Sequence, residues 1–320
     1  MKIKKSSLYA TLSAICVLIF SLNIIPLYID GDQLHYRDFY KYCFYDALTL
    51  SQQFFCYQNT LGSQEPGYFF ISKLAYLYLE KDIFISISNT ILTFFMTLLI
   101  LKYYQRNWQR IVFLIFVVTN YYFVVMLLSA ERLKFSFIFL IIALLISSNK
   151  KIIPFGLAML THIQSILLIG PYYLAQVFDK KTNIWIRGLV IFGFVSLSAA
   201  LFIFLNDHIE SKFTSYSSST NENGTGIIGV IKTSIFIFLA GISVRKIIPI
   251  ICGMPLIVLS YFLGSERIGM LAFILYVFTV LYYKRKMDIL LFVIMLYFSF
   301  KSIGFISNVI TYGTGYYFIE

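Results

Sequence analysis

Runs of 17 to 22 mainly apolar residues recur along this chain, and they constrain its fold more than any other feature. A helix rises about 1.5 Å per residue, so about 20 apolar residues cross the roughly 30 Å of hydrocarbon in a bilayer. Hydrophobic residues make up 59% of the 320 residues, and charged residues only 13%. One soluble core cannot hide so much apolar surface. The sequence therefore predicts an all-α, polytopic transmembrane protein, with one integral membrane domain over residues 1–320.

The net charge of +11 is explained by a membrane topology. A basic chain could bind nucleic acid, but basic residues of membrane proteins collect in cytoplasmic loops, which requires no nucleic-acid partner. Six clusters hold 16 of the 26 basic residues. They are Lys2/Lys4/Lys5, Lys102/Arg106/Arg110, Lys150/Lys151, Lys180/Lys181/Arg187, Arg245/Lys246 and Lys284/Arg285/Lys286. With all six inside, the N-terminus is expected in the cytoplasm and the C-terminus outside.

The membrane helices are then expected to alternate in direction. The first covers 8–29, and residues 30–82 follow as an outer loop with seven acidic and four basic residues. The later helices are expected at 83–101, 111–128, 133–148, 186–205, 227–244, 247–263, 268–283 and 288–306. Residues 206–226, rich in Ser, Asn and Gly, are expected to form a second outer loop. With a helix pair at 152–178, the total is about 10 to 11 membrane helices.

Two apolar segments do not fit as ordinary spans. Residues 67–79 would cover only about 20 Å as helix, so we expect an interfacial or re-entrant helix in the first outer loop. The segment 152–178 has basic residues at both ends and should begin and end inside. It is expected to form two short helices that turn near Thr161 and His162; the alternative is a single span.

Two Glu-Arg pairs stand between apolar segments, Glu131-Arg132 and Glu266-Arg267. On this topology both lie at the outward end of a helix pair. Each arginine could snorkel or pair locally, but adjacent residues of a helix do not face each other, so Arg132 must find another partner than Glu131. Ionisable residues at such positions usually mark a functional site.

Further cations are expected at similar depth, and they favour an anionic ligand. They are Lys134, Lys232 and Lys301. Arginine grips phosphate oxygens bidentately, whereas lysine acts as a point charge. A lipid-linked pyrophosphate would arrive at this depth, with its tail in the bilayer and its head at the interface.

The first outer loop supplies candidate acids and aromatic rings. Asp32 and Arg37 follow the first helix, and Glu65 precedes Pro66, where it could act in catalysis or cap a helix N-terminus. Among the many tyrosines of this loop, Tyr36 and Tyr68 could carry sugar rings or belong to a membrane-interface belt. His162 is a candidate base or phosphate ligand, and the alternative is a structural, hydrogen-bonded histidine.

Other chemistry is not indicated. No metal-ligand spacing, glycine-rich phosphate loop or serine-nucleophile motif is present, so we expect neither a metal nor a cofactor. Cys16 and Cys252 fall in membrane helices and are expected to be packing residues. Cys43 and Cys56 share the first outer loop, where an oxidising compartment would allow a disulfide.

The order of these motifs resembles the EpsG/Wzy-type family of bacterial polysaccharide polymerases. The resemblance rests on an outer Asp after the first helix, then "EPGYFFISKL", "SAERLKFSFIFLIIAL", "THIQSILLIGPYYL" and "SERIGMLAFILY", in that order over residues 25–285. Glu131 and Leu133 depart from the Asn or Gly and the Gln that the family pattern shows around the first arginine.

The resemblance implies a metal-independent glycosyltransferase with a GT-C-like fold in the bacterial cytoplasmic membrane. Its substrate would be an oligosaccharide repeat unit on a polyprenyl-pyrophosphate carrier, polymerised at the outer face for O-antigen, capsule or exopolysaccharide. Arg132 and Arg267 would bind the pyrophosphate, helped by Lys232 or Lys301, and Asp32, Glu65 or His162 would act on the acceptor hydroxyl. A chain-length regulator is the expected protein partner.

Three alternatives remain. A flippase for lipid-linked oligosaccharides would place its ionisable groups near the membrane midplane and carry an internal inverted repeat, and neither is evident. An acyltransferase would need a histidine towards the cytoplasm, which is not where His162 is expected. A scaffold would leave the charges inside the membrane unexplained.

Overall fold

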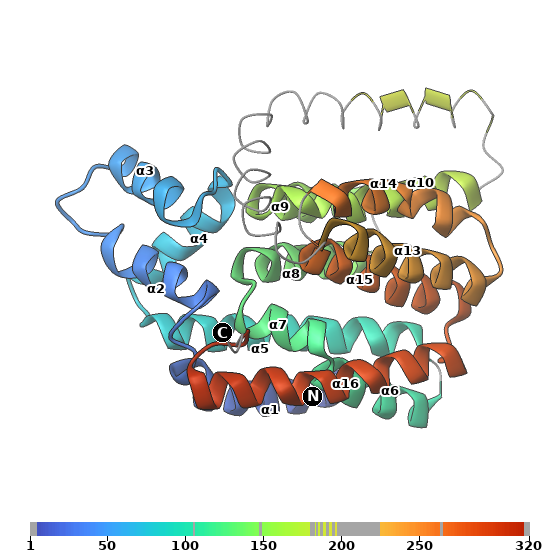
Figure 1. The fold of residues 1–320 in the computed structure, drawn as a ribbon, viewed down its shortest axis with the longest axis horizontal. Coiled ribbons are helices and arrows are strands. Elements are labelled where there is room, and N and C mark those ends of the chain that lie inside the picture. The colour runs from blue at the N-terminus through green and yellow to red at the C-terminus, as the bar shows by residue number, and fades with distance from the viewer. Residues whose placement is uncertain are drawn as a thin grey trace. The chain divides into compact units, whose positions relative to one another are not determined.

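The computed structural model describes residues 5–104, 106–146, 149–179, 225–262 and 265–316, with a few isolated positions between 183 and 196. Every regular element in these ranges is an α-helix or a short 3₁₀ helix (Figure 1). The prediction of an all-α fold is thus confirmed for the described part of the chain. The helix expected at 186–205 and the loop expected at 206–226 lie almost entirely outside it.

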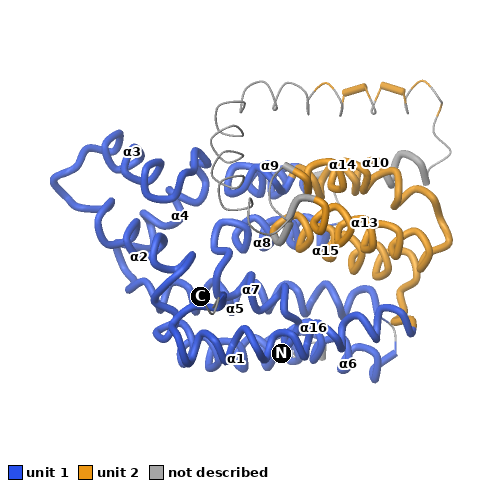
Figure 2. The backbone as a smooth tube through the Cα atoms, in the orientation of Figure 1, with its two compact units in different colours: residues 1–165, 289–320 blue, residues 166–288 orange. Residues whose placement is uncertain are grey.

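The chain packs as two compact units (Figure 2), and the single membrane domain expected over residues 1–320 stays a prediction. Unit 1 comprises residues 1–165 and 289–320, and unit 2 comprises residues 166–288. The helices of unit 1 are α1 (Lys5–Ile24), α2 (Asp32–Tyr42), α3 (Leu50–Leu61), α4 (Pro66–Tyr76), α5 (Lys81–Tyr103), α6 (Asn107–Thr119), α7 (Tyr121–Leu128), α8 (Glu131–Leu145), α9 (Ile152–Thr161) and α16 (Ile289–Tyr312). Those of unit 2 are α10 (Ile166–Asp179), α13 (Thr225–Val244), α14 (Ile248–Phe262) and α15 (Ser265–Lys284). The short 3₁₀ helices are η1 (Ile25–Leu27), η2 (Asn149–Lys151) and η3 (Ile163–Ser165).

Several helices are long and apolar enough to cross a membrane. Within the described residues there are 5 such helices, or up to 6 if the bent pair α6–α7 forms one span. The 5 are Ser6–Leu27, Lys81–Tyr103, Ile227–Val244, Arg267–Lys284 and Ile289–Tyr312. The chain is therefore a polytopic helical membrane protein. The count falls below the expected 10 to 11 because α8, α9, α10 and α14 have only 15, 10, 14 and 15 residues, and one expected helix is not described.

The segment expected as one helix at 111–128 is divided into two helices, and whether the pair crosses the membrane as one span stays a prediction. α6 and α7 meet at Asn120 with a bend of 52°. Asn120 adopts an extended conformation, and its side chain accepts a hydrogen bond from the backbone N–H of Tyr122 at 3.0 Å. A short polar side chain that can cap a new helix favours such a break over continuation.

A second break lies at His162, as the sequence predicted. α9 ends at Thr161, His162 is extended with φ −159° and ψ 108°, and η3 follows. The expectation that α9 and α10 form a tight pair stays a prediction.

In unit 1, three small helices gather beyond one end of the long ones (Figure 1). α1 packs along α5, α5 along α8, and α8 along α9, while α16 packs along α6 and α7. We call α2, α3 and α4 the cap. The disulfide predicted between Cys43 and Cys56 is present, with 5.5 Å between the Cα atoms, and it joins the end of α2 to α3. α4 confirms a helix in the segment 67–79, whereas its place at the membrane interface stays a prediction.

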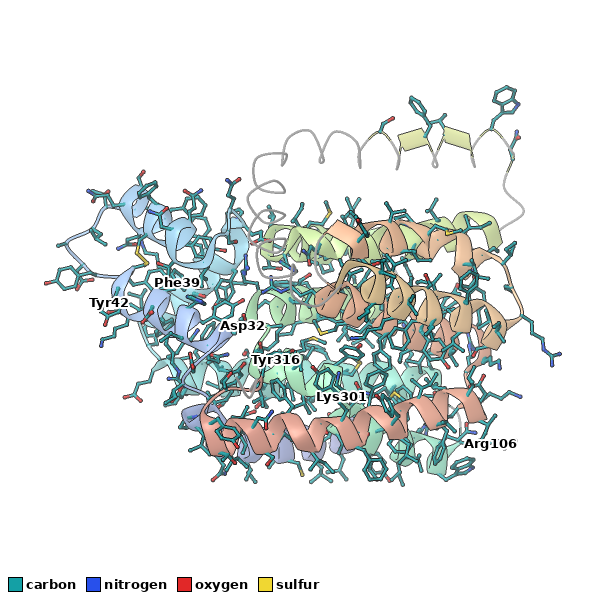
Figure 3. All side chains as sticks on the ribbon, in the orientation of Figure 1. Asp32, Phe39, Tyr42, Arg106, Lys301 and Tyr316 are labelled. Atoms are coloured by element: carbon teal, nitrogen blue, oxygen red, sulfur yellow. A yellow bond between two sulfur atoms is a disulfide. The ribbon has the colours of Figure 1, made fainter. Side chains whose placement is uncertain are left out.

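The two ends of unit 1 are held together by different contacts, and they differ in charge because a group of basic residues lies at one of them. At the cap end, the backbone N–H groups of Ile29 and Asp30 both donate to the carbonyl of Gly313, just after α16. At the other end, Lys102 Nζ donates to two carbonyls at the end of α8, at 3.0 and 3.2 Å. Arg106 and Asp32 mark the two ends in Figure 3. The basic residues Lys102, Arg106, Arg110, Lys150 and Lys151 belong to the end away from the cap.

Candidate functional site

The side chains of Glu65, Arg132 and His162 meet at the cap end of unit 1. Arg132 Nη1 lies 2.7 Å from Glu65 Oε2, and His162 Nδ1 lies 3.0 Å from Glu65 Oε1. Each of the three side chains is between 10% and 13% exposed, so the ions are largely shielded from water but still within reach of it. Three of the five residues predicted as catalytic are therefore in direct contact, although 67 and 97 positions separate the partners in sequence.

The local structure directs Glu65 into this cluster. Glu65 is the N-cap residue of α4, with Pro66 at the first position of the helix, but its side chain makes no capping hydrogen bond. The carboxylate accepts instead from Ser63 Oγ, Arg132 and His162. The hydroxyl of Tyr57 donates to the backbone carbonyl of Glu65 at 3.0 Å and so fixes the start of α4. Glu65 is thus the N-cap residue of α4 by position, but its side chain contacts Ser63, Arg132 and His162 and does not cap the helix.

The charge state of Glu65 follows from its neighbours. Burial raises the pKa of Glu65, but the hydrogen bond with His162 and the positive charge of Arg132 outweigh burial, so the pKa lies below its ordinary value of 4.5. Ionised Glu65 only accepts hydrogen bonds, so the Nδ1 atom of His162 carries the proton that they share. Nε2 lies 3.2 Å from Gln164 Oε1, an amide oxygen that only accepts, so Nε2 can exchange a proton with a ligand once the Gln164 side chain turns away.

Buried tyrosines surround the cluster. Arg132 Nε donates to the hydroxyl of Tyr36 at 3.4 Å, and the rings of Tyr36 and Tyr68 pack edge to face with centroids 5.8 Å apart. Burial raises the pKa of Tyr36, Tyr57 and Tyr68, so all three remain neutral. Tyr68 is fully buried, which makes its ring part of the packing around the ions. A sugar-binding role for Tyr36 and Tyr68 stays a prediction.

Glu131 forms a second ionic cluster beside the first. Its Oε2 atom lies 2.7 Å from Lys81 Nζ and accepts from the hydroxyl of Tyr68 at 2.6 Å. The ammonium of Lys81 also lies 5.1 to 5.5 Å from three ring centroids, those of Tyr36, Tyr40 and Phe84. Such cation–π contacts stabilise a charge shielded from water. Glu131 and Arg132 thus have different partners, as expected for neighbours in a helix.

Lys134 lies one turn further along α8 and is fully buried. Its Nζ atom donates to Asn89 Oδ1 at 2.6 Å and to the carbonyl of Leu127 at 3.1 Å. Asn89 in turn donates to Ser21 Oγ at 2.9 Å, which links α8, α5 and α1. The role predicted for Lys134 in substrate binding stays a prediction.

Asp32 and Arg37 also hold elements together. Asp32 Oδ2 accepts from Ser129 Oγ at 2.6 Å, which ties the start of α2 to the turn between α7 and α8. Arg37 Nη2 lies 2.7 Å from Asp82 Oδ1 and donates to the carbonyl of Ile25 at 2.9 Å. Their predicted roles on the substrate stay predictions.

The remaining predicted cations lie elsewhere in the chain. Lys301, on α16 of unit 1, places its ammonium 4.0 Å from the ring centroid of Tyr121 (Figure 3). Lys232 and Arg267 belong to unit 2, on α13 and α15, and Arg267 is exposed near the start of its helix. A shared site for Arg132 and Arg267 stays a prediction.

Three residues that shape the site were not singled out from the sequence. They are Gln33, Ser63 and Lys81. Lys81 stands at the start of an apolar helix, the same signal that singled out Arg132, and could have been found by it. Gln33 and Ser63 give no comparable signal because polar residues are common in an outer loop.

Among the residues that the structure describes, no group of three or more His, Cys, Asp or Glu is placed to hold a metal ion. The donors that meet at Glu65 are a carboxylate, an imidazole and a guanidinium. This set suits proton transfer and anion binding more than metal ligation.

The fold and this cluster define a class: a polytopic helical membrane protein with a shielded carboxylate–imidazole–guanidinium site at one end of its first unit. Comparison with protein-family models, with curated proteins and with solved structures finds no match to this chain. The assignment to the EpsG/Wzy-type family therefore stays a prediction from the sequence motifs.

Proposed function

We propose that this chain is a membrane glycosyltransferase that polymerises lipid-linked oligosaccharide repeat units at the outer face of the bacterial cytoplasmic membrane. The observation that carries the proposal is the contact of Glu65 with both Arg132 and His162. It supplies, side by side, a group that can take a proton and a cation that can receive a diphosphate.

The chemistry assigns one role to each of these residues. The acceptor hydroxyl oxygen forms a bond to the anomeric carbon of the growing glycan, and its proton passes to Nε2 of neutral His162 after the acceptor hydroxyl has displaced Gln164 Oε1 from that atom. Glu65 holds the ring by Nδ1 and stabilises the imidazolium that forms. The bond from the anomeric carbon to the carrier diphosphate breaks, and the diphosphate leaves with the electron pair.

Arg132 receives the charge that develops on the diphosphate. Glu65 and Tyr36 engage two of its five N–H donors, and the others can bind phosphate oxygens. One fixed donor of this kind lowers the barrier by about 3 kcal/mol. The GT-C-like fold and a contribution from Arg267 belong to the same proposal.

The charge asymmetry of unit 1 supports an outward-facing site. Basic residues lie at the end away from the cap, and the positive-inside rule assigns that end to the cytoplasm. The disulfide of the cap agrees, because disulfides persist in oxidising compartments.

Reconstitution tests the proposal. The full chain in nanodiscs or proteoliposomes is given a polyprenyl-diphosphate-linked repeat unit in the presence of a chelator, and products are resolved on a gel. We expect a ladder of glycans for the wild type. Arg132→Ala should abolish the ladder, and Arg132→Lys should recover little of it, because lysine cannot grip bidentately. Arg106→Ala removes the same side chain at the other end of unit 1 and should leave the ladder unchanged.

The alternative, a flippase, gives a different result. It would move the lipid-linked unit across the bilayer without lengthening the glycan. Fluorescent substrate that changes leaflet while no ladder forms would reject the polymerase and favour the flippase.

A further inference from the structure

The turn between α7 and α8 carries both ionic clusters, because Glu131 and Arg132 are the first two residues of α8. α7 ends at Leu128, and only Ser129 and Ala130 separate the two helices. The last carbonyls of a helix have no partner within it and need donors from elsewhere. The partners of this turn therefore decide where the two charged side chains point.

Two buried side chains supply the missing donors. Gln33 Nε2 donates to the carbonyl of Leu128 at 2.5 Å, and Lys134 Nζ donates to the carbonyl of Leu127 at 3.1 Å. Both side chains are fully buried. A cation at a helix C-terminus also interacts favourably with the helix dipole.

A third contact closes the turn from the side of the cap. Ser129 Oγ donates to Asp32 Oδ2 at 2.6 Å. Asp32 and Gln33 are the first two residues of α2, so one helix start reaches two successive residues of the turn. One helical turn further, the hydroxyl of Tyr36 meets Arg132 Nε at 3.4 Å. α2 thus contacts both the turn and the arginine that emerges from it.

We propose that Asp32, Gln33 and Lys134 are positioning residues that clamp the α7–α8 turn and thereby set the place of Arg132 at the site. This inference rests on the proposed function for its consequence in turnover. It changes the role expected from the sequence for Asp32 and Lys134, which was contact with the substrate. It also gives a function to Gln33, and it makes Ser129 the residue of the turn that Asp32 contacts.

Hydrogen exchange tests the clamp without any assay of activity. Ser129→Ala and Gln33→Met each remove one contact and nearly preserve the volume. In nanodiscs, we expect the amides of residues 129–132 to exchange about fivefold to tenfold faster in each variant, while the amides of α9 stay unchanged. Ser13→Ala is the matched control, since it removes a serine hydroxyl bonded to Thr97 inside the helix packing. It should leave exchange at 129–132 as in the wild type.

Turnover then separates positioning from catalysis at Asp32. Asparagine still accepts a hydrogen bond from Ser129 but cannot act as a base, whereas alanine does neither. We expect Asp32→Ala to lower kcat about tenfold with KM little changed, and Asp32→Asn to restore at least about a third of wild-type kcat. The double variant Asp32→Ala/Ser129→Ala should have a kcat no lower than that of Asp32→Ala, because both changes remove the same hydrogen bond.

The outcomes distinguish this inference from the proposed function. If wild-type protein forms no ladder but exchange accelerates as expected, the function is wrong and the clamp stands. Unchanged exchange in Ser129→Ala and Gln33→Met would overturn the clamp, even with a normal ladder. An Asp32→Asn variant as inactive as Asp32→Ala would make Asp32 a catalytic residue and overturn its positioning role.

Discussion

At the scale of single residues, shielded charges of the cap end occur as pairs. Arg132 faces Glu65, and Lys81 faces Glu131, each at 2.7 Å. Removing an ion from water is costly, and a partner at this distance offsets much of the cost. Loss of one partner is therefore expected to be worse than loss of both.

Glu131→Gln is predicted to destabilise the protein by about 3–5 kcal/mol, because it leaves the ammonium of Lys81 shielded and without a counter-ion. Thermal unfolding in nanodiscs measures the change. The double variant Glu131→Gln/Lys81→Met should lose less than the sum of the single changes. Asp288→Asn serves as a control, since it breaks a pair with Lys284 that is more open to water and should cost less than about 1 kcal/mol. An equal loss of stability in Glu131→Gln and Asp288→Asn would contradict a special need of Lys81 for its counter-ion Glu131.

The lowered pKa of Glu65 predicts a definite pH dependence. Because this pKa is depressed in the folded protein, the contribution of Glu65 to stability is fully present above its ordinary value of 4.5 and is lost as the pH falls further. The difference in stability between wild type and Glu65→Gln should thus shrink as the pH falls below about 4. Denaturation curves of the two proteins at several pH values give this difference. A gap that closes already near pH 6 would contradict ionised, stabilised Glu65.

At the scale of elements, α4 and α9 approach each other so closely that only glycine fits between them. A Cβ atom on Gly67 would lie 2.7 Å from the carbonyl carbon and oxygen of Leu160 and 2.8 Å from the backbone nitrogen of Thr161. These are backbone atoms, which cannot rotate away. Glu65 precedes α4 and His162 follows α9, so this contact of the two backbones sets the distance between carboxylate and imidazole.

Gly67→Ala is predicted to push α4 and α9 apart. We expect a loss of about 1–3 kcal/mol in stability and a fall of at least about tenfold in turnover, because the Glu65–His162 pair is displaced. Gly156→Ala in α9 is the matched control: its Cβ meets nothing within 4 Å, and it should be neutral or slightly stabilising. Thermal unfolding and the ladder assay measure both effects. Equal behaviour of the two variants would contradict a tight α4–α9 contact.

The sequence could predict elements better than contacts. Apolar length predicted α1, α5, α13, α15 and α16, and the spacing of basic residues and the histidine predicted the break at His162. The break at Asn120 was missed because one asparagine in an apolar run is weak evidence beside 18 residues of suitable length. The pairing of Glu65 with Arg132 could not be derived, because each side chain has a local explanation in the sequence. The two side chains meet only through tertiary structure, namely the packing of α4 against α9 and the position of the α7–α8 turn.

At the scale of the whole molecule, the charge asymmetry of unit 1 predicts which end faces the cytoplasm. For the labelling experiment, Cys16 and Cys252, the two cysteines outside the disulfide, are first replaced by alanine. Single cysteines are then introduced at the exposed positions Tyr78, beside the cap, and Trp108, at the basic end.

A membrane-impermeant maleimide should label Tyr78→Cys on intact cells, and Trp108→Cys only after permeabilisation. Arg267→Cys, exposed in unit 2, should label from the same side as Tyr78→Cys if both arginines serve one outward site. Labelling of positions 78 and 108 from the same side would contradict the topology. Labelling of position 267 only from the cytoplasm would remove Arg267 from the proposed site.

The covalent bond between Cys43 and Cys56 has a consequence for how the protein is made. Tyr57, which fixes the start of α4, directly follows the bonded Cys56. If the cap lies outside, as proposed, maturation of the site would follow an oxidation step on the outer side of the membrane. Cells without thiol-oxidising enzymes on that side of the membrane should accumulate a full-length, correctly inserted precursor. Recombinant production should therefore be monitored by the redox state of the purified chain as well as by its yield.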